Sequence, residues 1–114
     1  MKNEVKVLVN SAKEFKIINK DELLYLLATK NCTEIHLINE RKPSSSKSLK
    51  ECCELLQMDN LYRVCNSFAV NLMTVEKYDK YNKEIIFVTG EKLIIPCRQV
   101  SEFQKIMKEK FINL

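Results

Sequence analysis

Apolar and polar positions alternate over short segments in the N-terminal part of the chain, and this period of two predicts β-strands. Val5, Val7 and Val9 follow the alternation, with Leu8 as the exception. Residues 23–28 form an apolar run that is short enough for a buried strand. We therefore expect strands at 5–9, 15–18, 23–28 and 33–38, with a break at 20–22 and turns at 30–31 and 39–40.

The spacing changes to that of a helix after residues 43–46, a Pro- and Ser-rich stretch that predicts a loop. Ser48 can cap this helix through its hydroxyl, while the Glu51 side chain can reach back to the N–H group of Ser48. Behind the cap, one helical face collects Leu49, Cys52, Cys53 and Leu56. The pattern predicts a short internal helix.

The C-terminal half predicts further strands and a second helix. Residues 68–72, 74–78 and 84–89 are rich in β-branched or aromatic side chains. Gly90 and Glu91 predict a two-residue hairpin turn, from which residues 93–95 would pair back. Ser101 and Gln104 repeat the capping signal, and a terminal apolar stripe runs through Val100, Phe103, Ile106, Met107, Phe111 and Leu114. The prediction is a mostly β fold with core candidates Phe68, Val70, Ile86 and Ile94.

The composition is that of a globular protein. The chain has 114 residues, of which 46% are hydrophobic and 30% charged, so a single domain over residues 1–114 with one core is expected. No run has the apolar length needed to cross a bilayer, and the start lacks the apolar core of a signal peptide. These features predict a cytoplasmic protein without a membrane partner.

The net charge of +4 is a mild basic excess, compatible with a polyanionic partner and equally with an ordinary solvated surface. The basic residues gather in two segments. Residues 41–50 contain no acid and hold Arg41, Lys42, Lys47 and Lys50, and the C-terminal segment holds Lys105, Lys108 and Lys110. Charge alone does not decide between these two interpretations.

Catalytic and metal chemistry find little support in the chain. His36 is the only histidine and is expected in mid-strand, on the same face as Glu34. The five cysteines include no C-x-x-C pair, which argues against a zinc site or a disulfide framework. No Gly-rich phosphate loop is present. We therefore expect no enzyme, no metal and no cofactor, and we expect Cys52 and Cys53 in the core.

Three sequence blocks in a fixed order indicate a family. They are SLKE at residues 48–51, LYRVCNSFAVN at 61–71 and IIPCRQV at 94–100. Together they resemble the LytTR family of bacterial DNA-binding domains. That family usually has SLKE, then RV, two residues, Ser, an aromatic, two apolar residues and Asn, and then Ile-Pro, a small residue and Arg. The resemblance covers about residues 15–111, and Asn71, at the end of the second block, is interpreted as structural.

The resemblance implies an architecture and a function. LytTR domains are elongated stacks of small antiparallel sheets with one short internal helix and a C-terminal helix, and they present loops to DNA in place of a recognition helix. They are bacterial transcriptional regulators that bind double-stranded DNA sequence-specifically, with loops in successive grooves of tandem direct repeats. Many carry a receiver domain ahead of this module. The chain is therefore expected to be a freestanding regulator, with a second copy on DNA or a regulatory partner protein, or the output domain of a longer response regulator.

The resemblance also implies a set of DNA-contacting residues, namely Arg98, Asn66, Asn31, Lys30, Cys32, Arg63, Cys65 and Gln99. Arg98 matches the family's Arg that enters a major groove, although a surface ion pair is the alternative. Asn66 suits a base or a phosphate, or else stabilises its own turn. Lys30 is interpreted as a phosphate contact and Asn31 as a base contact. Arg63 is interpreted as a phosphate contact or part of a structural ion pair.

Three cysteines leave two other functions open. Some family members have His at the place of Cys32, His is frequent at the place of Cys65, and Ser is frequent at the place of Cys97. Because Cys is a poor hydrogen-bond donor, the chain could instead be a protein-interaction module that kept the fold and lost DNA reading. In a thiol-responsive DNA binder, Cys65 or Cys97 would be oxidised near the DNA. Small, semi-buried residues without a chemical role are the structural alternative.

Overall fold

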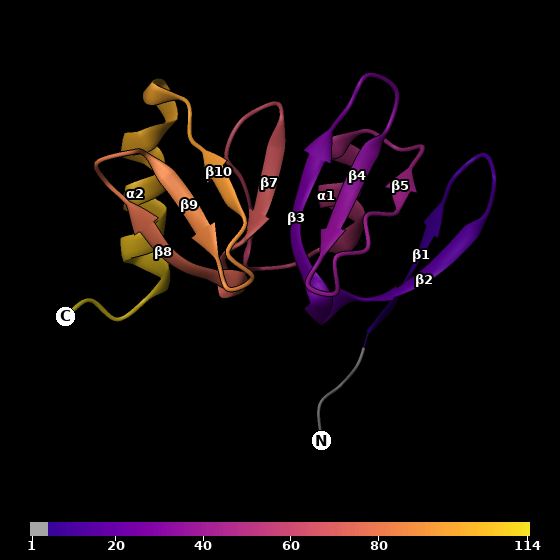
Figure 1. The fold of residues 1–114 in the computed structure, drawn as a ribbon, viewed down its shortest axis with the longest axis horizontal. Helices are drawn as coiled ribbons and strands as arrows, with labels where there is room; N and C mark the ends of the chain where they lie inside the picture. Colours follow the sequence, from indigo (N-terminus) through magenta and orange to yellow (C-terminus); the bar gives the residue numbers. More distant parts are fainter. Residues whose placement is uncertain (1–4) are drawn as a thin grey trace. The chain divides into compact units, whose positions relative to one another are not determined.

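The computed structural model describes residues 5–114, and the chain divides into two compact units, Met1–Asn71 and Leu72–Leu114, which we describe separately (Figure 1). Within the described residues, antiparallel strands form a two-stranded, a five-stranded and a three-stranded sheet, accompanied by two α-helices. The predicted mostly β fold of small antiparallel sheets, with one internal and one C-terminal helix, is confirmed.

The first unit contains a hairpin, the five-stranded sheet and one helix. Its elements are β1 (Lys6–Asn10), β2 (Phe15–Asn19), a 3-10 turn (Lys20–Glu22), β3 (Leu23–Ala28), β4 (Thr33–Leu37), β5 (Ser44–Ser45), α1 (Leu49–Leu56), β6 (Leu61–Arg63) and β7 (Phe68–Asn71). β1 pairs with β2, and the five-stranded sheet has the order β5-β4-β3-β7-β6. The four strands expected in the N-terminal part of the chain are all present, and the predicted bounds of the third agree with β3.

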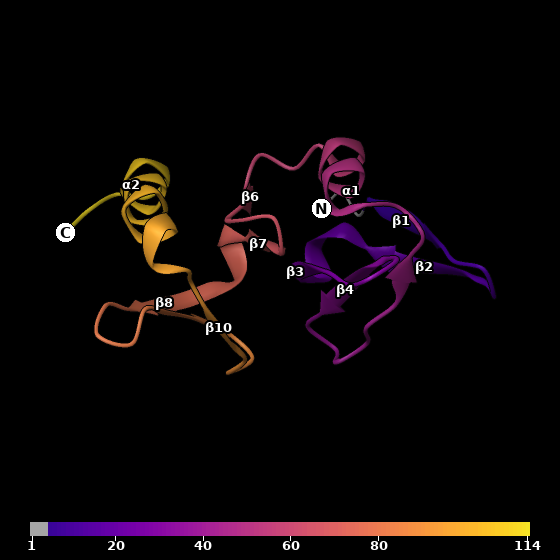
Figure 2. The same cartoon turned by 90° about the horizontal axis from the view of Figure 1, so that it is seen from above.

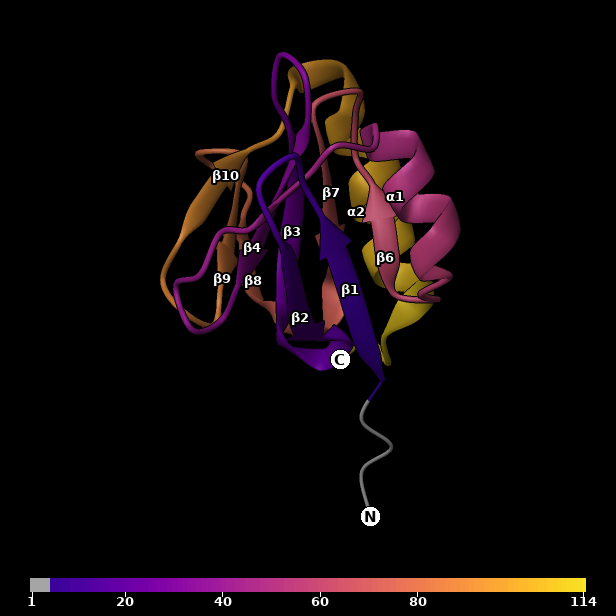
Figure 3. The same ribbon diagram turned by 90° about the vertical axis from the view of Figure 1, so that its right-hand side faces the viewer.

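Apolar side chains from the hairpin, the sheet and α1 form the core of the first unit. In the hairpin, Val9 and Ile18 are buried, whereas Leu8 and Ile17, paired across the two strands, are each about half exposed. The exception to the alternation therefore lies on the solvent side. Figure 3 shows α1 beside the hairpin. The buried cluster comprises Val9, Ile18, Leu23, Leu26, Ile35, Leu37, Leu49, Cys52 and Ala69, and Cys53 packs against it.

The internal helix begins as the sequence predicts. Ser48 Oγ accepts a hydrogen bond from the Glu51 N–H at 3.2 Å, and the Ser48 N–H donates to the Glu51 carboxylate at 3.3 Å. The capping box is therefore complete. The pKa of Glu51 is lowered mainly by the Ser48 backbone N–H and secondarily by the Ser48 hydroxyl, because hydrogen bonds donated to the carboxylate favour its charged form. After Leu56 the chain leaves the helix through Gln57, which adopts a left-handed conformation with φ 47°.

Asn71 joins two strands of the first unit. Its Nδ2 donates to the backbone oxygen of Leu23 at 2.8 Å, and both residues are buried. An apolar side chain at Asn71 would leave this buried carbonyl without the amide donor, at a cost of about 1–3 kcal/mol. The structural interpretation of Asn71 agrees with this geometry.

Two strands of the first unit were not predicted. β5 lies within residues 43–46, expected to be a loop, and pairs with β4 through Ser44 opposite Glu34 and Ser45 opposite Thr33. β6 pairs with β7 over three residues. Both strands are too short to show a period of two, and each exists because a neighbouring strand supplies its hydrogen-bonding partners.

The second unit is a three-stranded sheet with a helix on one face (Figure 2). Its elements are a 3-10 turn (Leu72–Thr74), β8 (Val75–Asp79), β9 (Glu84–Phe87), β10 (Lys92–Ile94), a 3-10 turn (Cys97–Gln99) and α2 (Val100–Lys110). Phe103 of α2 is fully buried, and its ring centroid lies 5.3 Å from that of Tyr78 on β8. Within residues 5–114, neither helix has the length and apolar character that a membrane span requires.

The hairpin between β9 and β10 differs from the predicted two-residue turn. The Phe87 N–H donates to the Glu91 oxygen at 2.9 Å, and the Gly90 N–H donates to the Phe87 oxygen at 2.8 Å. Residues 88–90 therefore form a three-residue loop. Gly90 has a φ of 91°, which suits the last position of such a loop. The need for a positive φ at this glycine was predicted correctly, and the position of the turn was not.

The register of this hairpin also corrects two core assignments. Ile94 pairs with Glu84 and is 68% exposed, and Ile86 pairs with Lys92 and is only half-buried. These pairs share the outward face, since they are two residues apart along each strand. The predicted burial of Phe68 and Val70, both on β7, is confirmed.

The C-terminal helix begins one residue before the predicted cap. α2 starts at Val100, and the residue before it, Gln99, already has helical dihedral angles and makes no side-chain capping bond. Ser101 therefore lies inside the helix, because the preceding 3-10 turn supplies the entry to it. Phe111 and Leu114, predicted to continue the apolar stripe, lie beyond Lys110 and are exposed.

Candidate nucleic-acid interface

The turn between β3 and β4 carries three of the predicted contact residues. The Thr29 N–H and Thr29 Oγ1 both donate to the Cys32 oxygen, at 2.9 and 3.1 Å, and thereby close the turn. Lys30 and Asn31 are exposed between these residues. Cys32 is half-buried, and its Sγ lies 2.9 Å from Thr29 Oγ1. The turn therefore presents Lys30 and Asn31 to solvent, while the thiol of Cys32 is engaged within the turn.

The loop between β6 and β7 lies beside this turn. The Ala28 N–H, at the end of β3, donates to the Ser67 oxygen at 2.7 Å and thereby joins the loop to the sheet. The Cys65 N–H donates to the Phe68 oxygen at 3.4 Å. Asn66 is exposed in this loop, and Cys65 is half-buried. Two predicted contact loops, far apart in the sequence, are thus neighbours at one end of the five-stranded sheet.

Both loops and the start of α1 line one groove with a volume of about 440 Å³. Five predicted contact residues take part in the lining, namely Lys30, Asn31, Cys32, Arg63 and Asn66. Cys65 belongs to the β6–β7 loop but not to this lining. The groove therefore brings together most of the predicted contacts that lie in the first unit.

Two further cations line the groove, Lys47 and Lys50, and both are exposed. They are not among the predicted site residues, although both belong to the acid-free basic segment at residues 41–50. That segment, and for Lys50 the SLKE block, is the available signal. Whether a surface lysine shares a site depends on the fold that surrounds it, here the pairing of β5 with β4 and the start of α1.

The groove is electropositive. Lys30, Lys47, Lys50 and Arg63 contribute positive charge, and Glu51 contributes the only carboxylate among the lining residues. Burial raises the pKa of the Cys53 thiol on α1, and the Arg63 charge opposes that shift. Exposed amides between cations match a partner that combines negative charge with hydrogen-bonding groups.

The second unit presents Arg98 and Gln99 on the 3-10 turn between β10 and α2. The Gln99 N–H donates to the Pro96 oxygen at 2.8 Å, which closes this turn. Arg98 is exposed and Gln99 is half-buried. Beside them, Lys83 Nζ donates to the Sγ of the exposed Cys97 at 3.5 Å. The turn therefore offers an exposed guanidinium on a short, hydrogen-bonded support.

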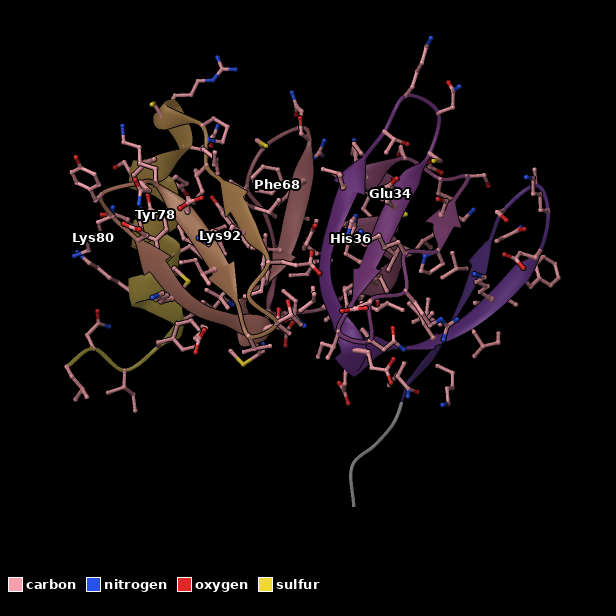
Figure 4. All side chains as sticks on the ribbon, in the orientation of Figure 1. Glu34, His36, Phe68, Tyr78, Lys80 and Lys92 are labelled. Atoms are coloured by element: carbon pink, nitrogen blue, oxygen red, sulfur yellow. The ribbon has the colours of Figure 1, made fainter. Side chains whose placement is uncertain are left out.

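The only histidine belongs to a polar pair on β4 (Figure 4). His36 Nε2 lies 3.1 Å from Glu34 Oε1, and the His36 ring stacks on Tyr25 with 4.2 Å between centroids. The expected placement of Glu34 and His36 on one face is confirmed. Neither residue lines the groove, and the stacking joins β4 to β3.

Comparison with known proteins gives a family match and a structural match. The model of the LytTr DNA-binding domain family matches residues 13–108, a range that includes parts of both units. A similar solved structure is the LytTr DNA-binding domain of a protein described as a methyl-accepting/DNA response regulator from Bacillus cereus. It is 22% identical to this chain, with a TM-score of 0.75 over 90% of this chain and 96% of its own. At this identity the likeness establishes the fold. No curated protein matches the chain.

Proposed function

Because the chain belongs to the LytTr DNA-binding domain family, we propose that it binds double-stranded DNA sequence-specifically and regulates transcription in a bacterial cytoplasm. The observation that carries this proposal is the groove of the first unit, where Asn31 and Asn66 come from two loops and lie among cations. Sequence reading requires hydrogen-bonding groups at base edges, and affinity for DNA comes largely from phosphate contacts. The groove supplies both kinds of group.

Each predicted contact receives a role under this proposal. Asn31 and Asn66 read base edges, since both are exposed amides. Lys30 and Arg63 contact phosphates. Cys32 supports the turn instead of reading a base, because its sulfur is engaged with Thr29.

Arg98 and Gln99 form a second contact surface, on the second unit, whereas Cys65 belongs to the first. Arg98 reads guanine from the second unit, since its exposed guanidinium can make the bidentate contact that this base offers in the major groove. Gln99 lies next to it on the same turn. Cys65 supports the loop that carries Asn66.

The binding site that we propose is a pair of tandem direct repeats, with one copy of this domain on each repeat. Two loop surfaces, one on each unit, would enter successive grooves, and bending the DNA would add specificity through deformable steps at a cost of about 1–6 kcal/mol. The structurally similar protein is described as a response regulator. We propose the corresponding role for this chain, as the output module of a longer regulator or as a freestanding regulator with a partner protein.

Selection from a random duplex library tests the proposed function. We expect a tandem motif to be enriched, and we expect its binding to weaken steeply as salt rises, with a log–log slope near the number of phosphates neutralised. If the folded protein enriches no motif at low salt, the proposal fails. The alternative, a protein-interaction module that has lost DNA reading, would then be favoured.

A thiol-responsive version of this function is a second candidate, and the position of Cys97 favours it. Its sulfur is exposed, contacts Lys83 Nζ and directly precedes Arg98. Hydrogen peroxide would transfer one oxygen to this sulfur, with cleavage of the O–O bond and release of water, to give a sulfenic acid. The added oxygen would lie next to the proposed base-reading guanidinium.

We expect peroxide to lower the duplex affinity of the wild type, and a reductant to restore it. Cys97→Ser should abolish this response, and Cys65→Ser, at a half-buried thiol, should retain it. Duplex titrations before and after peroxide treatment measure the effect. A response that survives in the Cys65→Ser/Cys97→Ser double variant would exclude both thiols.

A further inference from the structure

We propose that Lys47 and Lys50 form a phosphate-binding lysine pair that contacts the DNA backbone at the α1 side of the groove. This inference rests on the proposed function and adds to it two residues outside the predicted set of DNA contacts. Lys50 lies within the SLKE block at residues 48–51, and Lys47 directly precedes that block. Both lysines are exposed and line the same groove as Asn31 and Asn66. DNA that lies over this groove would therefore meet cations at the start of α1 as well as on the loops.

The backbone around Lys47 is held firmly. Thr33 Oγ1, on a fully buried residue of β4, donates to the Lys47 oxygen at 2.8 Å. The Lys47 N–H donates to Ser45 Oγ at 3.2 Å, and Ser45 itself pairs with Thr33 across β4 and β5. The sheet thus fixes the point from which the Lys47 side chain extends. A cation on such a support loses less conformational freedom on binding than one on a mobile loop.

Lys50 is positioned by the helix cap. It is the second residue of α1, and the two hydrogen bonds between Ser48 and Glu51 hold the first turn in which it lies. One of these bonds engages the only carboxylate among the lining residues, because the Glu51 carboxylate accepts the Ser48 N–H. The early N–H groups of a helix also favour a nearby anion. The α1 side therefore attracts negative charge despite the presence of Glu51.

The other lining residues make duplex DNA the matching partner. Among them, Lys30 and Arg63 accompany the exposed amides of Asn31 and Asn66. Cations that share one groove with base-reading amides correspond to the usual division of labour in DNA recognition, in which phosphate contacts position the protein and base contacts specify the sequence. The two lysines thus contribute affinity and position the protein on the duplex, and the two amides contribute specificity.

The lysine pair is tested with the Lys47→Gln/Lys50→Gln double variant of the full chain. We expect the slope of log affinity against log salt concentration to become shallower by about two. The ratio of wild-type to variant affinity should therefore shrink by about tenfold between about 50 and 200 mM salt. The affinity ratio between the selected site and a random duplex should stay within about twofold of the wild type, because phosphate contacts carry no sequence information. Fluorescence anisotropy titrations on both duplexes measure these quantities.

The matched control is Lys105→Gln/Lys108→Gln, which removes the same charge from α2. We expect it to keep the wild-type slope. An unchanged slope in Lys47→Gln/Lys50→Gln, with circular dichroism showing a folded protein, overturns the role of the lysine pair while leaving the proposed function intact. An equal change of slope in the control variant also overturns that role, because net charge would then explain the effect. Absence of duplex binding by the wild type overturns the proposed function and the role of the lysine pair together.

Discussion

Replacing Arg98 with alanine is expected to weaken binding to the selected duplex by about 1–3 kcal/mol, or roughly 5- to 200-fold. Arg98 is exposed on a 3-10 turn closed by the bond from the Gln99 N–H to the Pro96 oxygen. A guanidinium there can donate two hydrogen bonds to guanine, and its loss leaves those acceptors unpaired by protein. Titration of wild type and variant against the selected duplex and against single-base substitutions of it measures the effect.

Arg98→Lys is the matched control, since it retains the charge and removes the planar two-donor fork. We expect Arg98→Lys to recover the part of the duplex affinity that comes from positive charge, but not the discrimination at the contacted base pair. Loss of discrimination at one base pair in both variants supports base reading. If Arg98→Ala lowers affinity for the selected and random duplexes by the same factor, Arg98 contacts a phosphate and the assigned role is wrong.

The parts of the fold that sequence predicts well are those whose signals are local. The apolar run at residues 23–28 became β3, and the Ser48 and Glu51 capping pair became the observed start of α1. Both depend on residues within a few positions of one another. Gly90 shows the limit of this reasoning, because its positive φ was foreseen while the loop around it is one residue longer than expected.

The parts that sequence predicts poorly depend on distant partners. β5 is two residues long and exists because Thr33 and Glu34 lie opposite it. Ile94 looks like a core residue in the sequence, but its pairing with Glu84 places it on the outward face of the sheet. A shift of one residue in register exchanges the two faces of a strand, so burial within short strands cannot be deduced from apolarity alone.

The candidate site likewise contains parts that the sequence predicts and parts that depend on distant partners. The family resemblance identified Asn31 and Asn66, which lie far apart in the sequence, Asn66 within the block at residues 61–71 and Asn31 outside all three blocks. The bond between the Ala28 N–H and the Ser67 oxygen, which makes the two loops neighbours, has no local signature. Nor does the bond from Thr33 to Lys47, which fixes a basic segment at the same groove. Motifs can thus indicate single contact residues, and only the fold shows which lysines accompany them.

Phe103→Ala is expected to destabilise the second unit by about 3–5 kcal/mol, the usual cost of removing a buried aromatic side chain. Phe103 is fully buried in α2, and its ring packs against Tyr78 of β8. The cavity would loosen α2 from the sheet, and the turn that precedes α2 carries Arg98. Since a whole domain is commonly stable by only about 5–15 kcal/mol, we also expect this variant to lose duplex affinity. Urea unfolding monitored by circular dichroism measures the change.

Tyr78→Phe provides the control at the same contact, because it keeps the ring that faces Phe103 and removes only the hydroxyl. Within residues 5–114, the buried Tyr78 hydroxyl has no hydrogen-bond partner. Removing an unsatisfied buried polar group is nearly neutral or stabilising, so Tyr78→Phe should keep the wild-type unfolding midpoint or raise it. A destabilisation of Tyr78→Phe comparable to that of Phe103→Ala would mean that the hydroxyl, and not the aromatic packing, secures α2 and through it the position of Arg98.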